Sequence, residues 1–392
     1  MMVKRGHLSP EEWQQATTDV SAHSTRPSPR PARRKYLVWF RAVAARRLLC
    51  IDLPMDMTPP RQKRSRLEDV ARQAGVSAQT VSRVLRKPGL VAEATRLRVQ
   101  GAIDRLGYVP DLVARNLATS TTRMVAAIIP SLASSPFADT MQALSATLAA
   151  NGYQLLIGDS NYSPEHEDEL IQAMLGRRPD APVLTGTSRS RKARAMLARA
   201  GVPVVETWNL TANPIDLCVG FSNHAAGFDV ARYIFRRGYR RVAFIGRLRN
   251  DPRSEDRLRG FREGLRGHGM SPVRVIEVGD PATPEVGAAG IDELLRRYPD
   301  ADAVFFGSDR LAIGGLLACV RRGIAVPERL AIVGFGDFEI SSLTVPSLTT
   351  IAVPNREVGS VTGELLLARL AGREISERIV DLGYRFIQRE SA

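Results

Sequence analysis

Apolar and polar positions follow a repeating order along most of the chain, in which short apolar runs alternate with longer amphipathic stretches. From residue 123 onward, the apolar runs predict strands at 124–130, 153–159, 181–186, 202–207, 241–246, 273–278, 303–308 and 330–336. Apolar residues at helical spacing separate most of these runs and predict helices at 138–150, 165–176, 190–200, 224–238, 255–268, 288–298, 310–322 and 355–371. Such alternation is typical of parallel sheets with crossover helices. About 270 residues of this pattern predict an α/β core of two doubly wound parallel-sheet lobes.

The segment ahead of this core predicts three short helices. The first two, 66–74 and 78–86, are separated by a tight turn, Gly75-Val76-Ser77, in which Ser77 can cap the following helix. The second helix directs its apolar residues inward and leaves four polar residues facing out: Gln79, Thr80, Ser82 and Arg83. The third, 91–108, is predicted to direct three apolar residues inward: Leu97, Ile103 and Leu106. Two helices joined by a glycine-containing turn, with exposed polar residues on the second, are typical of a helix-turn-helix.

Residues 1–60 do not continue this pattern, and we expect a disordered or mis-assigned N-terminal extension. The stretch 26–35 is rich in proline and arginine and cannot hold a helix. The apolar piece 36–53 is interrupted by three arginines, so it is not a membrane span, and a short amphipathic helix there is the alternative. Met55 and Met57 are candidate starting points of the translated chain.

The distribution of charge points to nucleic acid. The chain has a formal net charge of +14, of which residues 1–57 carry +5, residues 58–121 carry +7 and residues 122–392 carry +2. A short basic module on a nearly neutral body is the expected footprint of nucleic-acid binding. A general basic bias is the alternative, since only five of the 55 basic residues are lysine, but such a bias does not explain the clustering.

No motif asks for an enzyme, and we predict no catalytic residue, no cofactor and no metal. There is no Gly-Lys pair for a phosphate-binding loop, GFSNH (220–224) is not a serine-hydrolase elbow, and HEDEL (166–170) is not a zinc helix. Three distant cysteines exclude a disulfide framework. No apolar run approaches a membrane span, and the N-terminus lacks a signal peptide, so we expect a cytoplasmic, nucleoid-associated protein with no membrane partner.

Residues 67–118 closely resemble the headpiece of LacI/GalR-type bacterial transcriptional repressors. Further family motifs follow in the core: SPFADTM (135–141), RRGYRRVAFIG (236–246), RLRGFREGL (257–265), SDRLAIGGL (308–316) and PSLTTI (346–351). The resemblance implies a helix-turn-helix DNA-binding domain, a hinge and an effector-binding and dimerisation core, at 61–108, 109–122 and 123–392. The segments VPVVETWN, DLCVGFSN and IVDLGYRF are most similar to the gluconate-repressor branch.

The same resemblance implies a core like that of periplasmic sugar-binding proteins, in which the chain crosses several times between two lobes. The first lobe is expected to take about 122–220 and 352–373. The second is expected to take about 221–351 and a final strand near 378–389.

Gln79 and Arg83 lie four residues apart on one face of the second helix, where they can read adenine and guanine in the major groove. Ala78 can contact a thymine methyl, and Ser77 and Thr80 are better placed for phosphates. A solvated polar face is the alternative for this helix. In the hinge, the resemblance implies that Leu117 wedges into the minor groove beside Arg115, or packs beneath the hinge.

The effector site is expected at the carboxyl ends of the strands of both lobes. The candidate residues are Ser131, Ser135, Phe137, Glu206, Trp208, Asn223, Arg257, Ser308 and Asp337. Arg257 occupies the position where the family keeps a ligand-binding arginine, and a guanidinium fork suits a carboxylate or a vicinal diol. The family often has two adjacent acids where this chain has Gly336 and Asp337. Loop packing or helix capping is the alternative role for each candidate.

The sequence therefore predicts a ligand-responsive transcriptional regulator, most simply a repressor, with operator DNA and a sugar or sugar-acid effector as its partners. A homodimer through the core lobes is expected because no heptad tail follows the last predicted strand. A stand-alone sugar-binding protein and a sugar-modifying enzyme with a fused DNA-binding domain are the alternatives.

Overall fold

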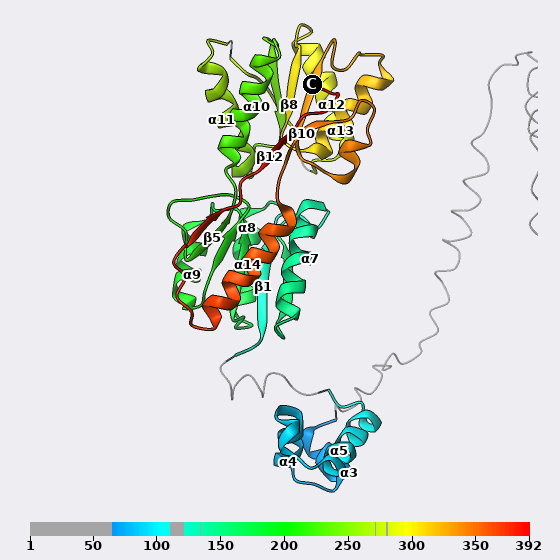
Figure 1. Cartoon of the computed structure of the whole chain (residues 1–392), viewed down its shortest axis with the longest axis vertical. Helices are drawn as coiled ribbons and strands as arrows, with labels where there is room; N and C mark the ends of the chain where they lie inside the picture. Colours follow the sequence, from blue (N-terminus) through cyan, green and yellow to red (C-terminus); the bar gives the residue numbers. More distant parts are fainter. Residues whose placement is uncertain (1–64, 110–120, 134, 271, 280) are drawn as a thin grey trace, which may run out of the picture. The chain divides into compact units, whose positions relative to one another are not determined.

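The computed structural model describes residues 65–109, 121–133, 135–270, 272–279 and 281–392 (Figure 1). The chain divides after Val109 into two compact units, the headpiece and the core. The predicted N-terminal extension to residue 60 and most of the predicted hinge, with Arg115 and Leu117, lie outside the described residues. Within the described ranges, no helix has both the length and the apolar character needed to cross a membrane.

The headpiece is a unit of three α-helices, as predicted. It comprises α3 (Leu67–Ala74), α4 (Ala78–Arg86), the short 3-10 helix η1 (Pro88–Leu90) and α5 (Glu93–Leu106). Gly75 ends α3 with a φ of 65°, and its N–H donates to the carbonyls of Ala71 and Arg72. This left-handed residue turns the chain tightly into α4, as a helix-turn-helix requires.

The inward face of α5 differs from the prediction at one position. Leu97 is 63% exposed, whereas Val99 and Ala102 are buried against Val70 and Val81 of the other two helices. Residues three apart on a helix share a face, so Val99 and Ala102 define the buried stripe, and Leu97, two residues before Val99, points elsewhere.

The first lobe of the core is built on a six-stranded parallel sheet in the order β11-β5-β4-β3-β1-β2. Its strands are β1 (Met124–Ile129), β2 (Gln154–Asp159), β3 (Ala181–Thr185), β4 (Val205–Thr207), β5 (Leu217–Gly220) and β11 (Ile379–Asp381). Its helices are α7 (Ser135–Ala149), α8 (Pro164–Leu175), α9 (Arg191–Ala200) and α14 (Asn355–Leu370).

Alternate residues of β1 explain why helices cover both faces of this sheet. Val125 and Ala127 pack in a cluster with residues of α7 and α14, whereas Ala126 and Ile128 pack in a cluster with residues of α8 and α9. A strand that is apolar on both faces must be buried on both, which produces the continuous apolar run seen in the sequence.

The second lobe repeats the architecture with the order β12-β10-β9-β8-β6-β7, in which only β12 is antiparallel to its neighbour. Its strands are β6 (Val242–Gly246), β7 (Arg274–Glu277), β8 (Ala303–Phe306), β9 (Ala331–Gly336), β10 (Thr349–Ala352) and β12 (Arg385–Ile387). Its helices are α10 (Asn223–Arg236), α11 (Pro252–Arg266), α12 (Pro284–Arg297), α13 (Asp309–Arg321) and the 3-10 helix η2 (Glu339–Ser342). The predicted pair of doubly wound lobes is confirmed.

The chain crosses between the lobes three times, after β5, after β10 and after β11 (Figure 1). The assignment of the whole of 378–389 to the second lobe is wrong, because β11 pairs with β5 in the first lobe and only β12 joins the second. Gly383, with a φ of 65°, lies in the short connection between these two strands.

Helices α10 and α11 approach each other closely through two glycines. A Cβ on Gly260 would lie 1.9 Å from the carbonyl oxygen of His224, and a Cβ on Gly227 would lie 2.0 Å from that of Arg257. The two backbones are therefore in direct contact, and this contact fixes the position of α11 against the rest of the lobe.

Candidate functional site

The N-terminus of α4 presents the residues predicted to meet DNA. The Ser77 hydroxyl accepts a hydrogen bond from the Thr80 N–H at 3.1 Å and lies 2.9 Å from the Thr80 hydroxyl. The Ser77 side chain therefore caps α4, with the Thr80 hydroxyl beside it, at a helix end whose free N–H groups favour phosphate. Ala78 is half-buried and packs against the headpiece cluster.

Gln79 and Arg83 are long polar residues on the exposed face of α4, and their side chains extend further from the helix than those of Ser77 and Thr80. Both side chains are exposed, and neither has a hydrogen bond or ion pair within the described part of the chain. Val81 and Val84 anchor the opposite face of the helix in the headpiece core. The helix is therefore anchored to the headpiece core and presents two long polar side chains that have no partner among the described residues.

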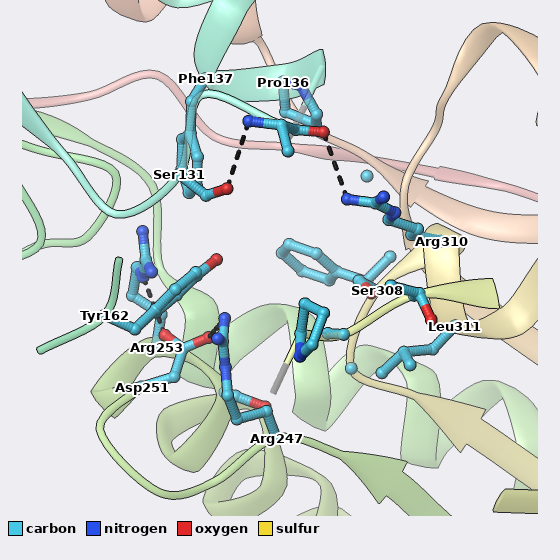
Figure 2. Close-up of a pocket in the computed structure, with 18 of the residues that line it drawn as sticks. Ser131, Pro136, Phe137, Tyr162, Arg247, Asp251, Arg253, Ser308, Arg310 and Leu311 are labelled. Carbon is cyan, nitrogen blue, oxygen red and sulfur yellow. Dashed lines mark hydrogen bonds and ion pairs between the residues drawn. The ribbon is translucent and has the colours of Figure 1, made fainter. Parts of the chain in front are cut away.

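A cavity of about 320 Å³ lies between the two lobes of the core, where strands of both sheets end (Figure 2). The first lobe lines it with residues that follow β1, β2 and β4: Ser131, Pro136, Phe137, Asn161, Tyr162 and Trp208. The second lobe lines it from β6, β8, β9 and their following segments: Arg247, Asp251, Arg253, Ser254, Arg257, Ser308, Arg310, Phe335 and Phe338. This is the position that open parallel sheets generally give to a ligand.

Aromatic rings form one wall of the cavity. Phe137 meets Trp208 edge to face at a centroid distance of 4.7 Å, and Trp208 meets Phe221 at 5.8 Å. Trp208 has a φ of 69°, a strained conformation for a bulky residue, and the side-chain amide of Asn223 donates to its carbonyl at 2.9 Å. Asn223 thus holds the backbone that places the indole at the cavity.

Arg257 lies at the base of the polar wall. It is 7% exposed, its Nη1 donates to the Asn223 side-chain oxygen, and its guanidinium carbon lies 4.2 Å from the centre of the Phe335 ring. Burial is the main cause that lowers the pKa of Arg257 to about 10; Asp251 opposes it and the neighbouring Arg253 adds to it. The charge of this arginine is therefore poorly compensated within the protein.

Two further arginines share a single aspartate. Asp251 accepts a hydrogen bond from Nε of Arg253 at 3.0 Å and lies 3.9 Å from Nη2 of Arg247. Burial alone would raise the pKa of Asp251, but the positive charges of Arg253, Arg257 and Arg247 outweigh it, and the pKa lies below its ordinary value. The guanidinium carbon of Arg247 lies 3.0 Å from the centre of the Tyr162 ring, and both residues are labelled in Figure 2.

Three residues of the cavity lining each have a buried donor nitrogen that lacks a hydrogen-bond partner among the described residues: the indole nitrogen of Trp208, Nη1 of Arg253 and Nε of Arg257. Buried donors in folded proteins are almost always paired, so these nitrogens are available to an acceptor that the described protein atoms do not supply.

The structure brings most of the predicted effector residues together. Ser131, Phe137, Trp208, Arg257 and Ser308 line the cavity, and Asn223 supports two of them from behind. Ser135 is the first residue of α7, and its side chain lies outside the described atoms.

Glu206 and Asp337 line neither of the two cavities described here, which departs from the prediction. Glu206 is fully buried in β4, where it accepts from the N–H of Ile215 at 2.8 Å. Asp337 is paired with Arg389 at 2.7 Å. Both carboxylates therefore have partners outside the two cavities.

Several residues that line the cavity were not predicted from the sequence, although the positions of strand ends and helix faces could have indicated some of them. Tyr162 follows β2 and Arg247 follows β6, so the rule on strand ends applied to them as well. Arg253 lies four residues before Arg257 on α11 and shares its helix face. Arg310 donates to the Ala133 carbonyl of the other lobe at 3.2 Å. The two residues are far apart in the sequence, so a local sequence pattern cannot predict this contact.

A second cavity, of about 340 Å³, adjoins the first and shares Tyr162 and Arg253 with it. Its walls are rich in hydroxyl and amide side chains, namely Ser160, Ser163, Thr185, Thr187, Ser188, Ser190, Asn209 and Asn250. Arg189, buried in its wall, lies with its Nε 3.0 Å from the Glu167 carboxylate.

Comparison with known proteins agrees with this architecture. Residues 66–111 match the family described as "Bacterial regulatory proteins, lacI family", and residues 231–392 match the "Periplasmic binding protein-like domain". The chain is 40% identical over 329 residues to the HTH-type transcriptional regulator GntR of Pseudomonas aeruginosa, an alignment that covers 84% of this chain and 96% of that protein.

Solved structures give the same picture. A LacI-family transcriptional regulator from Silicibacter pomeroyi is similar with a TM-score of 0.79 and 34% identity, over 83% of this chain and 99% of that one. Transcription regulator GntR from Chromobacterium violaceum is similar with a TM-score of 0.66 and 38% identity, over 68% of this chain and 98% of that one. With a lacI-type headpiece, a periplasmic-binding-like core and relatives of this identity along nearly their whole length, the chain belongs to the LacI family of bacterial regulatory proteins.

Proposed function

We propose that the effector of this ligand-responsive, DNA-binding transcriptional regulator is a sugar acid of the gluconate type, bound in the cavity between the lobes. One observation carries the proposal: the cavity is lined by buried arginines and an aromatic wall, and it includes an indole N–H with no partner among the described residues. Arginine and N–H donors suit a carboxylate and hydroxyl oxygens, and an aromatic face suits the C–H side of a sugar chain. The relatives named GntR and the resemblance to the gluconate-repressor branch support the same class.

The ligand acts, on this proposal, by favouring one arrangement of the two lobes. Arg310 and Ala133 already join the lobes across the cavity, so a ligand between them contacts both. A ligand shifts such an equilibrium only by its difference in affinity for the two arrangements, and operator DNA must then weaken ligand binding in return. We propose release of DNA on ligand binding, with the hinge residues Arg115 and Leu117 as the minor-groove contacts. Such a regulator acts in the cytoplasm, at the chromosome.

The test is a gel-shift titration of the full chain on operator DNA with and without gluconate, alongside calorimetry of gluconate binding. We expect gluconate to bind and to weaken the DNA complex. Binding of a neutral sugar or a purine in place of gluconate would contradict the sugar-acid class and leave the DNA-binding role intact. Turnover of the sugar, or no DNA binding under any condition, would favour the alternative classes.

Base reading by α4 gives a first prediction. Arg83→Ala should relax preference at one base position in each half-site and weaken binding there by about 1–3 kcal/mol, because an arginine fork pairs with guanine. Arg83 is exposed and has no partner within the described chain, so the headpiece should stay folded. Gel shifts on a set of singly substituted operators measure the effect.

Arg96→Ala serves as the matched control. Arg96 lies on α5 and, among the described residues, pairs with Glu93 on its own helix, so its substitution should weaken binding little and evenly across sequences. Equal weakening of specific and random DNA by Arg83→Ala would show that Arg83 contacts only phosphates.

A dimer is the second expectation, since one helix-turn-helix reads too few base pairs to select an operator. The second lobe carries exposed large apolar side chains on α10, on α13 and in the segment after β9: Phe228, Leu317, Val320, Ile340, Leu343 and Val345. Exposed apolar side chains concentrated in one lobe are typical of a self-association surface.

The double substitution Leu343→Glu with Val345→Glu should therefore shift the chain from dimer to monomer in light scattering at micromolar concentration, because burying two carboxylates in an apolar interface is costly. Leu132→Glu changes an exposed leucine of the first lobe and should leave the dimer intact. A wild-type monomer or tetramer would contradict the proposed assembly.

A further inference from the structure

The two cavities of the core lie against the same stretches of chain. Ser131, Asn161 and Trp208 line the first cavity, and a residue next to each of them in sequence lines the second. Tyr162 and Arg253 line both cavities. The side chains of these two residues therefore form a partition between the cavities. The inference that follows rests on the proposed effector role of the first cavity.

Tyr162 is held at this partition by residues of the other lobe. The guanidinium carbon of Arg247 lies 3.0 Å from the centre of the tyrosine ring, and that of Arg253 lies 5.8 Å from it. The φ of Tyr162 is 57°, a left-handed conformation that a bulky residue keeps only where its surroundings impose it. Figure 2 shows the three side chains together at one side of the first cavity.

The segment that carries Tyr162 is tied down on both sides of this residue. The N–H of Ser160 donates to the carbonyl of Ile129, in β1, at 2.9 Å. The Ser163 hydroxyl accepts from the N–H of His166 at 3.1 Å and so caps α8. The ring is therefore a fixed part of the wall between the cavities.

The second cavity has a lining that suits a neutral sugar unit. Arg189, in its wall, already has a counter-ion in Glu167. The hydroxyl groups of Thr185 and Thr187 line the cavity and have no hydrogen bond within the described part of the chain. Such hydroxyls can both donate to and accept from the hydroxyl groups of a sugar.

The size of the two cavities indicates what the partition excludes. They measure about 320 and 340 Å³, each near the lower end of the range of about 300–1,000 Å³ that is typical of small-molecule sites. A ligand that filled both would be a sugar acid carrying a second, neutral sugar, and the Tyr162 ring lies in its path. We propose that Tyr162 sets the length of the effector: it admits a single sugar acid and excludes one that carries a second sugar. A clash with the wrong ligand is a general source of specificity.

Tyr162→Gly tests this inference, because it removes the ring and glycine readily adopts a φ of 57°. Tyr162→Asn is a second variant of the same kind, since asparagine also tolerates this conformation. Tyr162→Phe is the matched control that keeps the ring. Phe338→Ala removes a ring from the lining of the first cavity only, and so controls for a general gain in space. A thermal melt of each variant shows whether the core remains folded.

Calorimetry on the full chain with gluconate, maltobionate and melibionate measures the selectivity. The last two compounds are gluconate with a second sugar on O4 and on O6. We expect wild type and Tyr162→Phe to bind both about tenfold or more weakly than gluconate, because the second sugar meets the ring. In Tyr162→Gly and Tyr162→Asn, at least one of the two should gain about tenfold or more in affinity, and gluconate should still bind.

A further pair of substitutions locates the second sugar. Thr185→Val with Thr187→Val, added to Tyr162→Gly, removes two hydroxyls from the second cavity and keeps the shape of the side chains. It should weaken the longer ligand by about fivefold or more and change gluconate binding little. An unchanged affinity for the longer ligand would place its second sugar elsewhere and contradict the inference.

Wild type that binds a longer ligand as tightly as gluconate would overturn the inference and leave the proposed function standing. The same holds for an equal gain in Phe338→Ala, or for no gain in Tyr162→Gly and Tyr162→Asn while gluconate still binds. Failure of wild type to bind any of the three compounds would overturn the proposed function as well. The two failures are therefore distinguishable.

Discussion

Gly260→Ala is expected to destabilise the core by about 3 kcal/mol or more, an unusually large effect for the addition of one methyl group. The new Cβ would lie 1.9 Å from the carbonyl oxygen of His224, which belongs to the backbone of α10 and cannot rotate away. The two helices must therefore separate where they touch, and overpacking of a tight interior typically costs about 1–3 kcal/mol even where side chains can adjust. Urea denaturation followed by circular dichroism measures the change in unfolding free energy.

Gly267→Ala is the matched control for this variant. Gly267 follows the last turn of α11, has ordinary right-handed geometry, and a Cβ there would meet no atom closer than 3.6 Å. It should be neutral or slightly stabilising. An unchanged denaturation midpoint for Gly260→Ala would mean that α10 and α11 do not touch through their backbones as described above.

Arg257→Ala is expected to abolish the response to the effector while leaving operator binding unchanged. The guanidinium is buried in the cavity lining and lies in the core, a unit separate from the headpiece that carries α4. Charged hydrogen bonds contribute about 1.5–3 kcal/mol each, so removing a two-point interaction should lower ligand affinity about a hundredfold or more. Calorimetry with the effector and gel shifts on operator DNA measure the two functions separately.

Arg257→Lys is the companion variant, because it keeps the charge but not the planar fork that bonds to Asn223. We expect it to bind the effector more tightly than Arg257→Ala and more weakly than wild type. A thermal melt of each variant shows whether the core remains folded. Retention of full effector response in Arg257→Ala would place the effector elsewhere in the molecule.

Strand periodicity was enough to predict the lobes, because parallel strands buried on both faces are continuous apolar runs. The runs that became β1 and β9 stand out for this reason. β5 and β10 were not among the predicted strands, although β7 and β8, which also have four residues, were. β11 was placed in the wrong lobe, since three residues give no local sign of which sheet edge they will join.

The site was predictable only in its outline. The rule that ligands meet strand ends located Ser131, Trp208 and Ser308 correctly, but it does not tell which way a side chain points. Residues two apart share a face of a strand, but Trp208 lies beyond the end of β4 with a φ of 69°, so the alternation does not extend to it, and Trp208 lines the cavity whereas Glu206 does not. The partner of Asp337 is Arg389, 52 residues later, and such long-range pairings leave no trace in a local pattern.

The interleaving of the two lobes also affects the order in which the protein can fold during synthesis. β1 to β5 leave the ribosome first, yet α14, which packs on α7 through Gly359 and Thr140, begins only at Asn355. At about 5–20 residues per second, the roughly 135 residues between β5 and α14 take about 7–27 seconds to make. Throughout that interval, apolar side chains of α7 such as Leu144 lack their covering helix, so the nascent first lobe is a natural client for chaperones until the second lobe has been translated.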